Sequence, residues 1–360
     1  MRLRILIFVW ALCTTAVTNA QTPDTTTSYP KLFAHRGCWN KVIPENTPDA
    51  VRMAARMGYE GIELDARWTA DSVLVVFHDR RINKKLRHAS DYSKIAEPTL
   101  LASLTFEQLR NEYVLASPNK TMRQPVATLD DMLQACKECG MIPMLHSNIP
   151  ASYQQAQALF GNDWICFTAD YERILEVRTY SDCLVLYSLR EEIPLDELFT
   201  RLERIGGRVG ISTMTTAMLT PEFCHALTSR GYEVQASIFR APAEMVAQRN
   251  GITYQLTDFS MMPNPQRTPQ YRWTLRQAQT LSPETPITQS WEAVECGALT
   301  LEIAYEGEVT VTLNGKRTYP LSGRGVEHIG TRLFGQSPTL HITTNGKGKV
   351  LRAEALVYCF

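Results

Sequence analysis

Residues 61–80 read GIELDARWTADSVLVVFHDR, and this stretch decides the fold. It contains two short apolar runs, at 61–65 and 73–78, with only seven residues between them. A parallel crossover normally needs about a dozen residues or more, so the two runs are expected to form an antiparallel hairpin. With the turn centred between Asp71 and Ser72, the predicted register places His78 opposite Asp65.

Outside this hairpin, short apolar runs alternate with amphipathic stretches of helical period from residue 32 to residue 258. The further runs lie at 32–35, 141–146, 164–168, 183–188, 208–212, 233–238 and 253–257. When the second hairpin strand is set aside, eight strands remain in a βα order. This pattern predicts the α/β class and a TIM (β/α)8 barrel over residues 30–262.

The segment 80–126 is long for a barrel loop, and we expect it to form an insertion over the barrel mouth with a short helix from Thr105 to Tyr113. After residue 262 the residue composition and the hydrophobic pattern change. Proline and polar residues predict a linker over 263–284, and alternating apolar residues predict a small antiparallel β-sandwich over 285–360. Cys296 and Cys359 bracket this second domain, and one expectation is a disulfide between them.

The first twenty residues have the composition of a cleaved signal peptide: Arg2 and Arg4, then an apolar run, then small residues up to Ala20. Export to the periplasm or the extracellular space is therefore expected. The rest of the chain has no long apolar run, which argues against stable membrane insertion. The 37 basic residues equal the 37 acidic ones, so no nucleic-acid partner is indicated.

Four polar side chains lie at the predicted carboxyl ends of barrel strands, where such barrels place their active sites: His35, Glu63, Asp65 and His78. Glu63 and Asp65 are two residues apart on one strand and therefore face the same side. Paired carboxylates suit a divalent cation, and the two histidines have the chemistry of a general acid and a general base.

These residues also carry a family resemblance. The chain resembles the glycerophosphodiester phosphodiesterase (GDPD) family over about residues 30–262. The motifs that match in order and spacing are His35-Arg36-Gly37, Pro44-Glu45-Asn46-Thr47, Glu63-Leu64-Asp65, Thr69-Ala70-Asp71 and His78-Asp79.

The resemblance implies a metal-dependent phosphoric diester hydrolase of lipid metabolism that acts on a small-molecule glycerophosphodiester. Glu63 and Asp65 would hold one divalent metal ion, usually calcium or magnesium. His35 and His78 would be the catalytic acid and base, and a cyclic phosphate would form and then be opened by water.

Two further roles follow from the same resemblance. Arg36 would bind the substrate phosphate, and Glu45 and Asn46 would support the site.

One strand departs from the family pattern. Where relatives have Glu-x-Lys, this chain has His146 and Asn148. His146 would replace a metal carboxylate, which shifts the expected metal from calcium towards manganese or zinc. Because Asn148 stands where relatives have the lysine, the expected phosphate-binding site has one positive charge fewer. A degenerate site, in which His146 only fills space, is also compatible with the sequence.

The sequence is compatible with more than one function for the barrel. It could be a catalytically weak binding module for phosphorylated surface glycans, or it could act on lysolipids in the manner of a phospholipase D. The basic segment 80–88 could be a phosphate-steering lid or a solvated loop. Trp291, Tyr305 and Tyr319 could form a glycan-contact platform, although core packing is the favoured interpretation.

Overall fold

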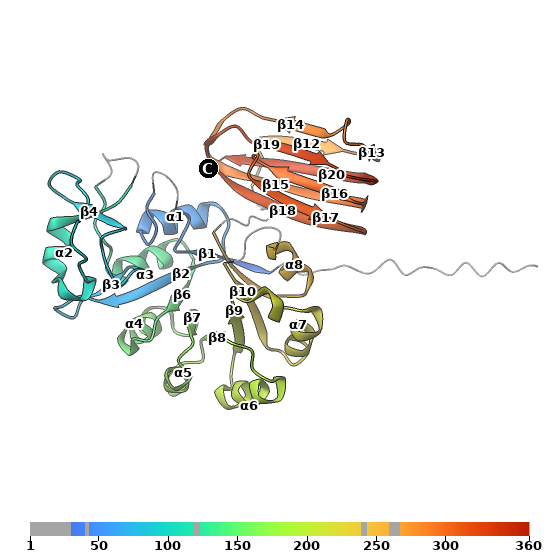
Figure 1. Ribbon diagram of the computed structural model, residues 1–360. Helices are drawn as coiled ribbons and strands as arrows, with labels where there is room; N and C mark the ends of the chain where they lie inside the picture. The colour runs from blue at the N-terminus through green and yellow to red at the C-terminus, as the bar shows by residue number, and fades with distance from the viewer. Residues whose placement is uncertain (1–29, 40–42, 118–122, 239–242, 259–266, 360) are drawn as a thin grey trace, which may run out of the picture.

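The computed structural model describes residues 30–39, 43–117, 123–238, 243–258 and 267–359, and it comprises a barrel and a C-terminal sandwich (Figure 1). The expected signal peptide at 1–20 lies outside the described residues. Within them, no helix is both long and apolar enough to cross a bilayer.

The predicted eight-stranded parallel barrel is confirmed. Its strands, in chain order, are β1 (Lys31–His35), β2 (Gly61–Trp68), β6 (Ile142–His146), β7 (Ile165–Thr168), β8 (Leu184–Leu189), β9 (Val209–Thr213), β10 (Glu233–Ser237) and β11 (Tyr254–Thr257). The barrel closes because β1 pairs in parallel with both β2 and β11. The carboxyl ends of all eight strands therefore meet at one rim.

Helices follow the strands around the barrel. They are α1 (Pro48–Arg56), α3 (Leu129–Glu138), α4 (Pro150–Phe160), α5 (Tyr171–Arg178), α6 (Leu195–Ile205), α7 (Pro221–Thr228) and α8 (Ala243–Arg249), with a 3-10 turn η2 at Thr216–Met218. Side-chain caps begin two of these helices: the Thr47 side chain caps α1, and Thr128 forms a capping box with Asp131 at the start of α3.

The hairpin of β2 and β3 (Leu74–Val76) is confirmed as antiparallel, but its predicted register is wrong by one residue. The backbone amide of Phe77, not of His78, donates to the Asp65 carbonyl at 2.9 Å. The reason lies in the turn, where the Thr69 amide donates to the Val73 carbonyl and Ser72 adopts φ 62°. A three-residue loop thus replaces the expected two-residue turn.

The insertion contains β4 (Leu86–His88), η1 (Leu101–Ser103), α2 (Phe106–Glu112) and β5 (Tyr113–Leu115). The short helix expected from Thr105 to Tyr113 is present as α2, and Thr105 caps it. The insertion has a small core of its own, which includes Ile82, Leu86, Leu101 and Leu109. It is thus a compact subdomain rather than an open loop.

The C-terminal domain consists of two antiparallel sheets. One has the order β12-β20-β15-β18, with β13 also paired to β20, and the other has the order β14-β19-β16-β17. The bounds are β12 (Tyr271–Leu275), β13 (Gln279–Leu281), β14 (Ile287–Ser290), β15 (Val294–Gly307), β16 (Val309–Leu313), β17 (Arg317–Leu321), β18 (Arg324–Gln336), β19 (Thr339–Thr343) and β20 (Gly348–Cys359).

Two details of this domain bear on what the sequence predicts for it. Strands β12 and β13 lie within 263–284, so much of the expected linker is part of the sandwich. Tyr305 and Tyr319 are each only 1% exposed, which confirms core packing for them and removes them from an exposed glycan platform. Trp291 packs against the same core.

The expected disulfide is wrong, because both Cys296 and Cys359 are free. The strand register explains this result. Cys359 pairs with Gly297, so Cys296 is one residue out of register and its side chain points to the opposite face of the sheet. The Cys296 thiol instead contacts the Met53 sulfur of α1 at 3.3 Å.

The sandwich packs on the barrel beside α1 and α8 (Figure 1). Leu356 and Tyr358 of β20 belong to the barrel's hydrophobic core, and Met245 of α8 belongs to the sandwich core. Arg249 of α8 also forms an ion pair with Glu327 of β18 at 2.9 Å. The interface is therefore continuous with both cores.

Candidate active site

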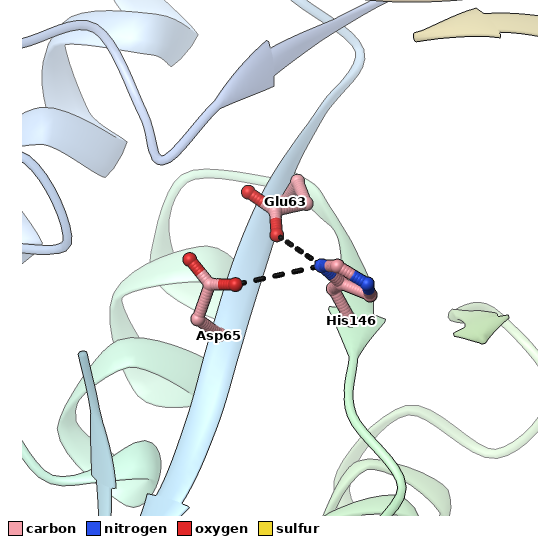
Figure 2. Close-up of side chains that lie close together, drawn as sticks. All are labelled: Glu63, Asp65 and His146. Atoms are coloured by element: carbon pink, nitrogen blue, oxygen red, sulfur yellow. Dashed lines mark ion pairs between the residues drawn. The ribbon is translucent and has the colours of Figure 1, made fainter. Parts of the chain in front are cut away.

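Two buried carboxylates form the centre of the site. Glu63 and Asp65 alternate with Leu64 along β2, so both side chains point into the barrel at its carboxyl rim, and they are only 1% and 5% exposed. His146 reaches them from the end of β6, the neighbouring strand, as Figure 2 shows. Its Nδ1 lies 3.6 Å from Glu63 Oε1 and 3.5 Å from Asp65 Oδ1.

The three side chains fit a divalent cation. Their ligand atoms all lie within 4.8 Å of one another. Two ligand atoms that each lie about 2.1 Å from a tetrahedral cation are about 3.4 Å apart, and so are two adjacent ligand atoms about 2.4 Å from an octahedral cation. This separation is close to the distances from His146 Nδ1 to the two carboxylate oxygens. Two carboxylates and one imidazole could therefore hold a metal ion here.

The charges in this cluster shift the pKa values of its members in opposite directions. Burial raises the pKa of Asp65, but His146, His78 and Arg36 together outweigh that effect and the pKa is lowered. Partial burial lowers the pKa of His146, yet the contacts with Asp65 and Glu63 raise it to about 10. Without a metal ion, the imidazole is therefore protonated at neutral pH and supplies the positive charge that the carboxylates attract.

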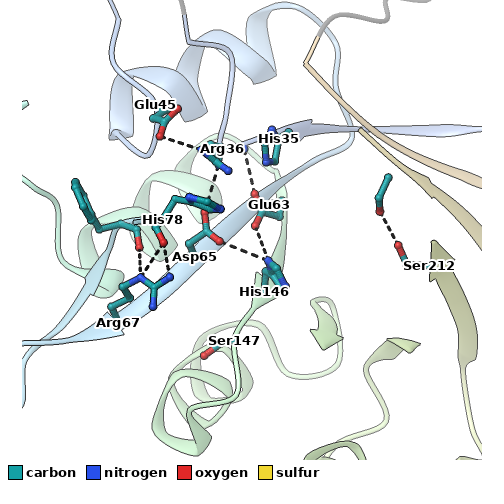
Figure 3. A network of polar contacts seen from close by, with 12 residues as sticks. His35, Arg36, Glu45, Glu63, Asp65, Arg67, His78, His146, Ser147 and Ser212 are labelled. Atoms are coloured by element: carbon teal, nitrogen blue, oxygen red, sulfur yellow. Dashed lines mark hydrogen bonds and ion pairs between the residues drawn. The ribbon is translucent and has the colours of Figure 1, made fainter. Parts of the chain in front are cut away.

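Arg36 lies on the other side of the carboxylates (Figure 3). Its backbone amide donates to Glu63 at 3.2 Å, and its Nε lies 3.5 Å from Asp65 Oδ2. A φ of 57° turns the chain here, and the side chain is held by Glu45, whose Oε1 accepts from Nη1 at 3.1 Å. Arg36 is thus oriented by two acidic groups and faces the candidate metal site.

His35 ends strand β1 and is paired with an acid from the opposite end of the barrel sequence. Its Nδ1 lies 2.8 Å from Oδ1 of Asp258, which follows β11. Burial lowers the pKa of His35, but the bond to Asp258 and the charge of Glu63 outweigh it, so the pKa is raised. Asp258 responds in the opposite sense: burial raises its pKa, whereas the bond and charge of His35 and the charge of Arg332 lower it. The pair fixes the imidazole, leaving Nε2 for other contacts.

His78 lies beyond β3 and is 41% exposed at the side chain. Its Nδ1 lies 2.7 Å from Asp79 Oδ1. Arg67 of β2 donates to the backbone carbonyls of Phe77 and His78, which fixes the chain there (Figure 3). Although the register differs from the predicted one, His78 lies close enough to Asp65 for its charge to help lower the pKa of that carboxyl group.

A pocket of about 490 Å³ opens beside Asp65, His78 and His146, and we call it the catalytic pocket; His35, Arg36 and Glu63 are not among its described lining residues. Its described lining includes Asp65, Arg67, His78, His146, Asn148 and Arg190. The ring of His146 stacks on Phe167, with centroids 4.6 Å apart. His146 thus points towards both carboxylates, not away from them, which argues against a purely space-filling role.

The remaining predicted residues lie in different surroundings. Asn148 lines the catalytic pocket, but Glu45 and Asn46 line a second pocket, behind Arg36. Lys85, from the basic segment 80–88, contacts Glu45 at 2.9 Å. This lysine is therefore an ordered part of the second pocket, not a freely solvated one.

Three residues of the site were not among the predicted site residues. The sequence could have indicated Asp258 as a site residue, because it directly follows Thr257, the last residue of a predicted barrel strand. No such signal indicated Arg67 and Arg190, since an arginine after a strand is common on protein surfaces. Both arginines line the catalytic pocket together with Asn148. They add positive charge to a lining in which Asn148 is neutral.

Comparison with known proteins identifies the family that this chain resembles. Residues 35–180 match the model of the "Glycerophosphoryl diester phosphodiesterase family". Glycerophosphodiester phosphodiesterase 1 of Rattus norvegicus is 28% identical over 146 residues, which cover 37% of this chain and 41% of that protein. The human protein of the same name is 32% identical over 107 residues, 30% of this chain and 29% of that protein. The match thus spans less than half of these relatives.

Solved structures share the barrel fold. A phosphodiesterase of Oleispira antarctica, in complex with the product sn-glycerol-3-phosphate, superposes with a TM-score of 0.52 at 17% identity, covering 64% of this chain and 93% of that chain. A glycerophosphodiester phosphodiesterase of Parabacteroides distasonis gives a TM-score of 0.50 at 21% identity, with coverage of 64% and 93%. The similarity therefore covers almost the whole of both of those chains.

Proposed function

Because this chain belongs to the glycerophosphoryl diester phosphodiesterase family, we propose that it hydrolyses a glycerophosphodiester or a related alcohol phosphodiester. The observation that carries this proposal is the arrangement at the carboxyl rim: two buried carboxylates facing His146 on one side and Arg36 on the other. This arrangement provides a seat for a cation next to a guanidinium, which suits a phosphate group.

In the proposed mechanism, the histidines move protons. Asp258 holds Nδ1 of His35, and Asp79 holds Nδ1 of His78, so each ring presents Nε2 to the substrate. One imidazole takes the proton from a glycerol hydroxyl next to the phosphate, and the other protonates the leaving alcohol. A cyclic phosphate and a free alcohol result, and water then opens the ring with the histidine roles reversed.

The remaining side chains bind and orient the phosphate. Glu45 and Asp65 hold the guanidinium of Arg36, which contacts the phosphate oxygens. A divalent metal ion held by Glu63, Asp65 and His146 supplies neutralisation of phosphate charge when bound. The family uses calcium or magnesium, whereas the imidazole of His146 favours manganese or zinc in this chain.

The test is a divalent-metal screen against a panel of phosphodiesters, followed by phosphorus NMR. We expect conversion of glycerophosphodiesters to glycerol phosphate, with a transient cyclic phosphate resonance. Diesters without a vicinal hydroxyl should not react. Binding of the diesters without turnover, with every metal, would overturn the hydrolase proposal and support a binding module.

We also propose that the protein is exported, on the basis of the N-terminal segment 1–20. N-terminal sequencing of the mature protein should then start close to residue 21. Recovery of intact Met1 from a cell extract, with no protein in the exported fraction, would contradict export.

A further inference from the structure

A second cavity, of about 570 Å³, lies between the barrel and the sandwich, and we call it the interdomain pocket. Its barrel wall includes Trp39, Asn46 and Phe77, and its sandwich wall includes Arg317 and Phe334. The volume falls within the range of small-molecule sites, about 300–1,000 Å³. The described residues that line it differ from those of the catalytic pocket.

The interdomain pocket adjoins the candidate active site. Glu45 lines the interdomain pocket and contacts Arg36 at 3.1 Å, and Arg36 in turn lies 3.5 Å from Asp65 of the catalytic pocket. Phe77 also lines the interdomain pocket, and the next residue, His78, lines the catalytic pocket. The two pockets are therefore neighbours, with the Arg36–Glu45 pair between them.

The charge of this pocket is positive. Among its described lining residues, the single acid Glu45 stands against four basic side chains: Lys85, Lys316, Arg317 and Arg332. Glu45 is itself compensated by Lys85 at 2.9 Å and by Arg36. Among the described lining residues, positive charge therefore exceeds negative charge, and a concave site of one sign attracts ions of the other.

Asn46 provides the second indication of a ligand. The residue is 2% exposed and lines the pocket, yet within the described part of the chain neither Nδ2 nor Oδ1 of its amide has a hydrogen-bond partner. A buried amide without partners is costly, and such groups in proteins are usually satisfied by a ligand, a water or another residue. A hydroxylated ligand could satisfy both atoms, since a hydroxyl group donates and accepts.

We infer that the interdomain pocket binds the leaving alcohol of the substrate and selects alcohols that carry a hydroxyl group and an additional negative charge. This inference rests on the proposed hydrolase function. The hydroxyl pairs with Asn46, the anionic group lies among the sandwich cations, and Trp39, Phe77 and Phe334 cover the carbon skeleton. The anionic group is a carboxylate or a second phosphate, which share the chemistry that these cations recognise.

The first test compares kcat/KM for four glycerophosphodiesters. The alcohols are choline, which is cationic; glycerol, which is neutral; glycerate, which carries a carboxylate; and glycerol phosphate, which carries a second phosphate. The wild-type protein should prefer the two anionic alcohols over choline. The ratio between the glycerate and glycerol phosphate diesters then shows which anion the pocket takes.

Lys316→Glu should reduce the preference for the anionic alcohols over choline by about threefold to tenfold, through reversal of one nearby charge. The matched control is Lys347→Glu, which makes the same charge change on an exposed turn of the same domain and is not among the described lining residues. Equal effects of the two variants, or no wild-type preference, would overturn the inference.

A binding experiment separates this inference from the proposed activity. Metal-free protein is titrated with 3-phosphoglycerate, which has a hydroxyl, a carboxylate and a phosphate but no diester bond. Lys316→Glu and the pocket-filling variant Ala116→Phe should each weaken binding at least threefold, whereas Asp65→Asn should retain it. Binding that is lost in Asp65→Asn and retained in both pocket variants would place the probe in the catalytic pocket and overturn the inference, even if no diester is hydrolysed.

Discussion

Arg332 of the sandwich donates from Nε to the hydroxyl of Tyr59 in the barrel at 3.0 Å, and both residues are only 4% exposed. Nη2 of the same arginine lies 3.5 Å from the carbonyl oxygen of Thr257, the residue before Asp258. A guanidinium keeps its charge even when buried, so its hydrogen bonds must be supplied by the protein. Arg332 thereby links the sandwich to the end of β11, which Asp258, the partner of His35, directly follows.

We predict that Tyr59→Phe lowers the free energy of unfolding by about 1–3 kcal/mol, because the buried charge of Arg332 loses a hydrogen-bond acceptor. Urea denaturation measures the change. The control is Tyr271→Phe, which removes a hydroxyl that contacts Glu292 at 3.1 Å in exposed surroundings and should change stability by less than about 0.5 kcal/mol. Equal effects of the two substitutions would mean that the interdomain bond contributes little.

His35→Ala and His78→Ala should each reduce kcat by about 10²- to 10⁴-fold, the range expected for loss of a general acid or base. His341→Ala, in the sandwich, is the control and should retain the wild-type rate. Circular dichroism and metal titration should show that the active-site variants remain folded and still bind metal. A near-native rate in either variant would remove that histidine from the acid–base pair.

Asp258→Asn should shift the pH dependence of kcat/KM. Asp258 raises the pKa of His35, so its removal lowers that pKa. The limb of the pH–rate profile that belongs to His35 should therefore move to lower pH, and kcat should fall because the ring is no longer held by a charged partner. An unchanged profile would show that His35 does not titrate in the catalytic step.

Metal affinity should rise with pH. In the metal-free protein the pKa of His146 is raised to about 10, so below that pH a metal ion must displace a proton from the imidazole. Affinity should increase up to about tenfold for each pH unit between about pH 6 and 8, as measured by calorimetry. His146→Gln should flatten this dependence, and an equally steep slope in that variant would exclude His146 as a ligand.

His146→Glu introduces the carboxylate that the family resemblance implies for this position. A third hard oxygen ligand should move the metal preference from manganese or zinc towards calcium or magnesium. The measurement is the rank order of the dissociation constants of these four ions, in the wild-type protein and in the variant. The same order in both proteins would contradict a metal-ligating role for residue 146.

The sequence by itself determined the barrel and most of its site. The seven-residue gap after Asp65 allowed only a hairpin, and the alternation of apolar runs and helices required a parallel barrel for the other strands. Parallel strands in a closed barrel end at one rim, so His35, Glu63 and His146 had to lie close together. These conclusions depend on the local hydrophobic periodicity and on the number of residues between apolar runs, and both can be read from the sequence alone.

Only the tertiary structure decided the hairpin register, the partner of His35 and the surroundings of Asn46. The register depended on the φ of Ser72, a conformation that residue identity does not fix for serine. Asp258 is 223 residues from His35, and Arg332 reaches the barrel from another domain. The first contact arises from closure of the barrel, which pairs β1 with β11, and the second from the docking of the sandwich on the barrel. Both depend on surfaces formed by many residues rather than on any local pattern.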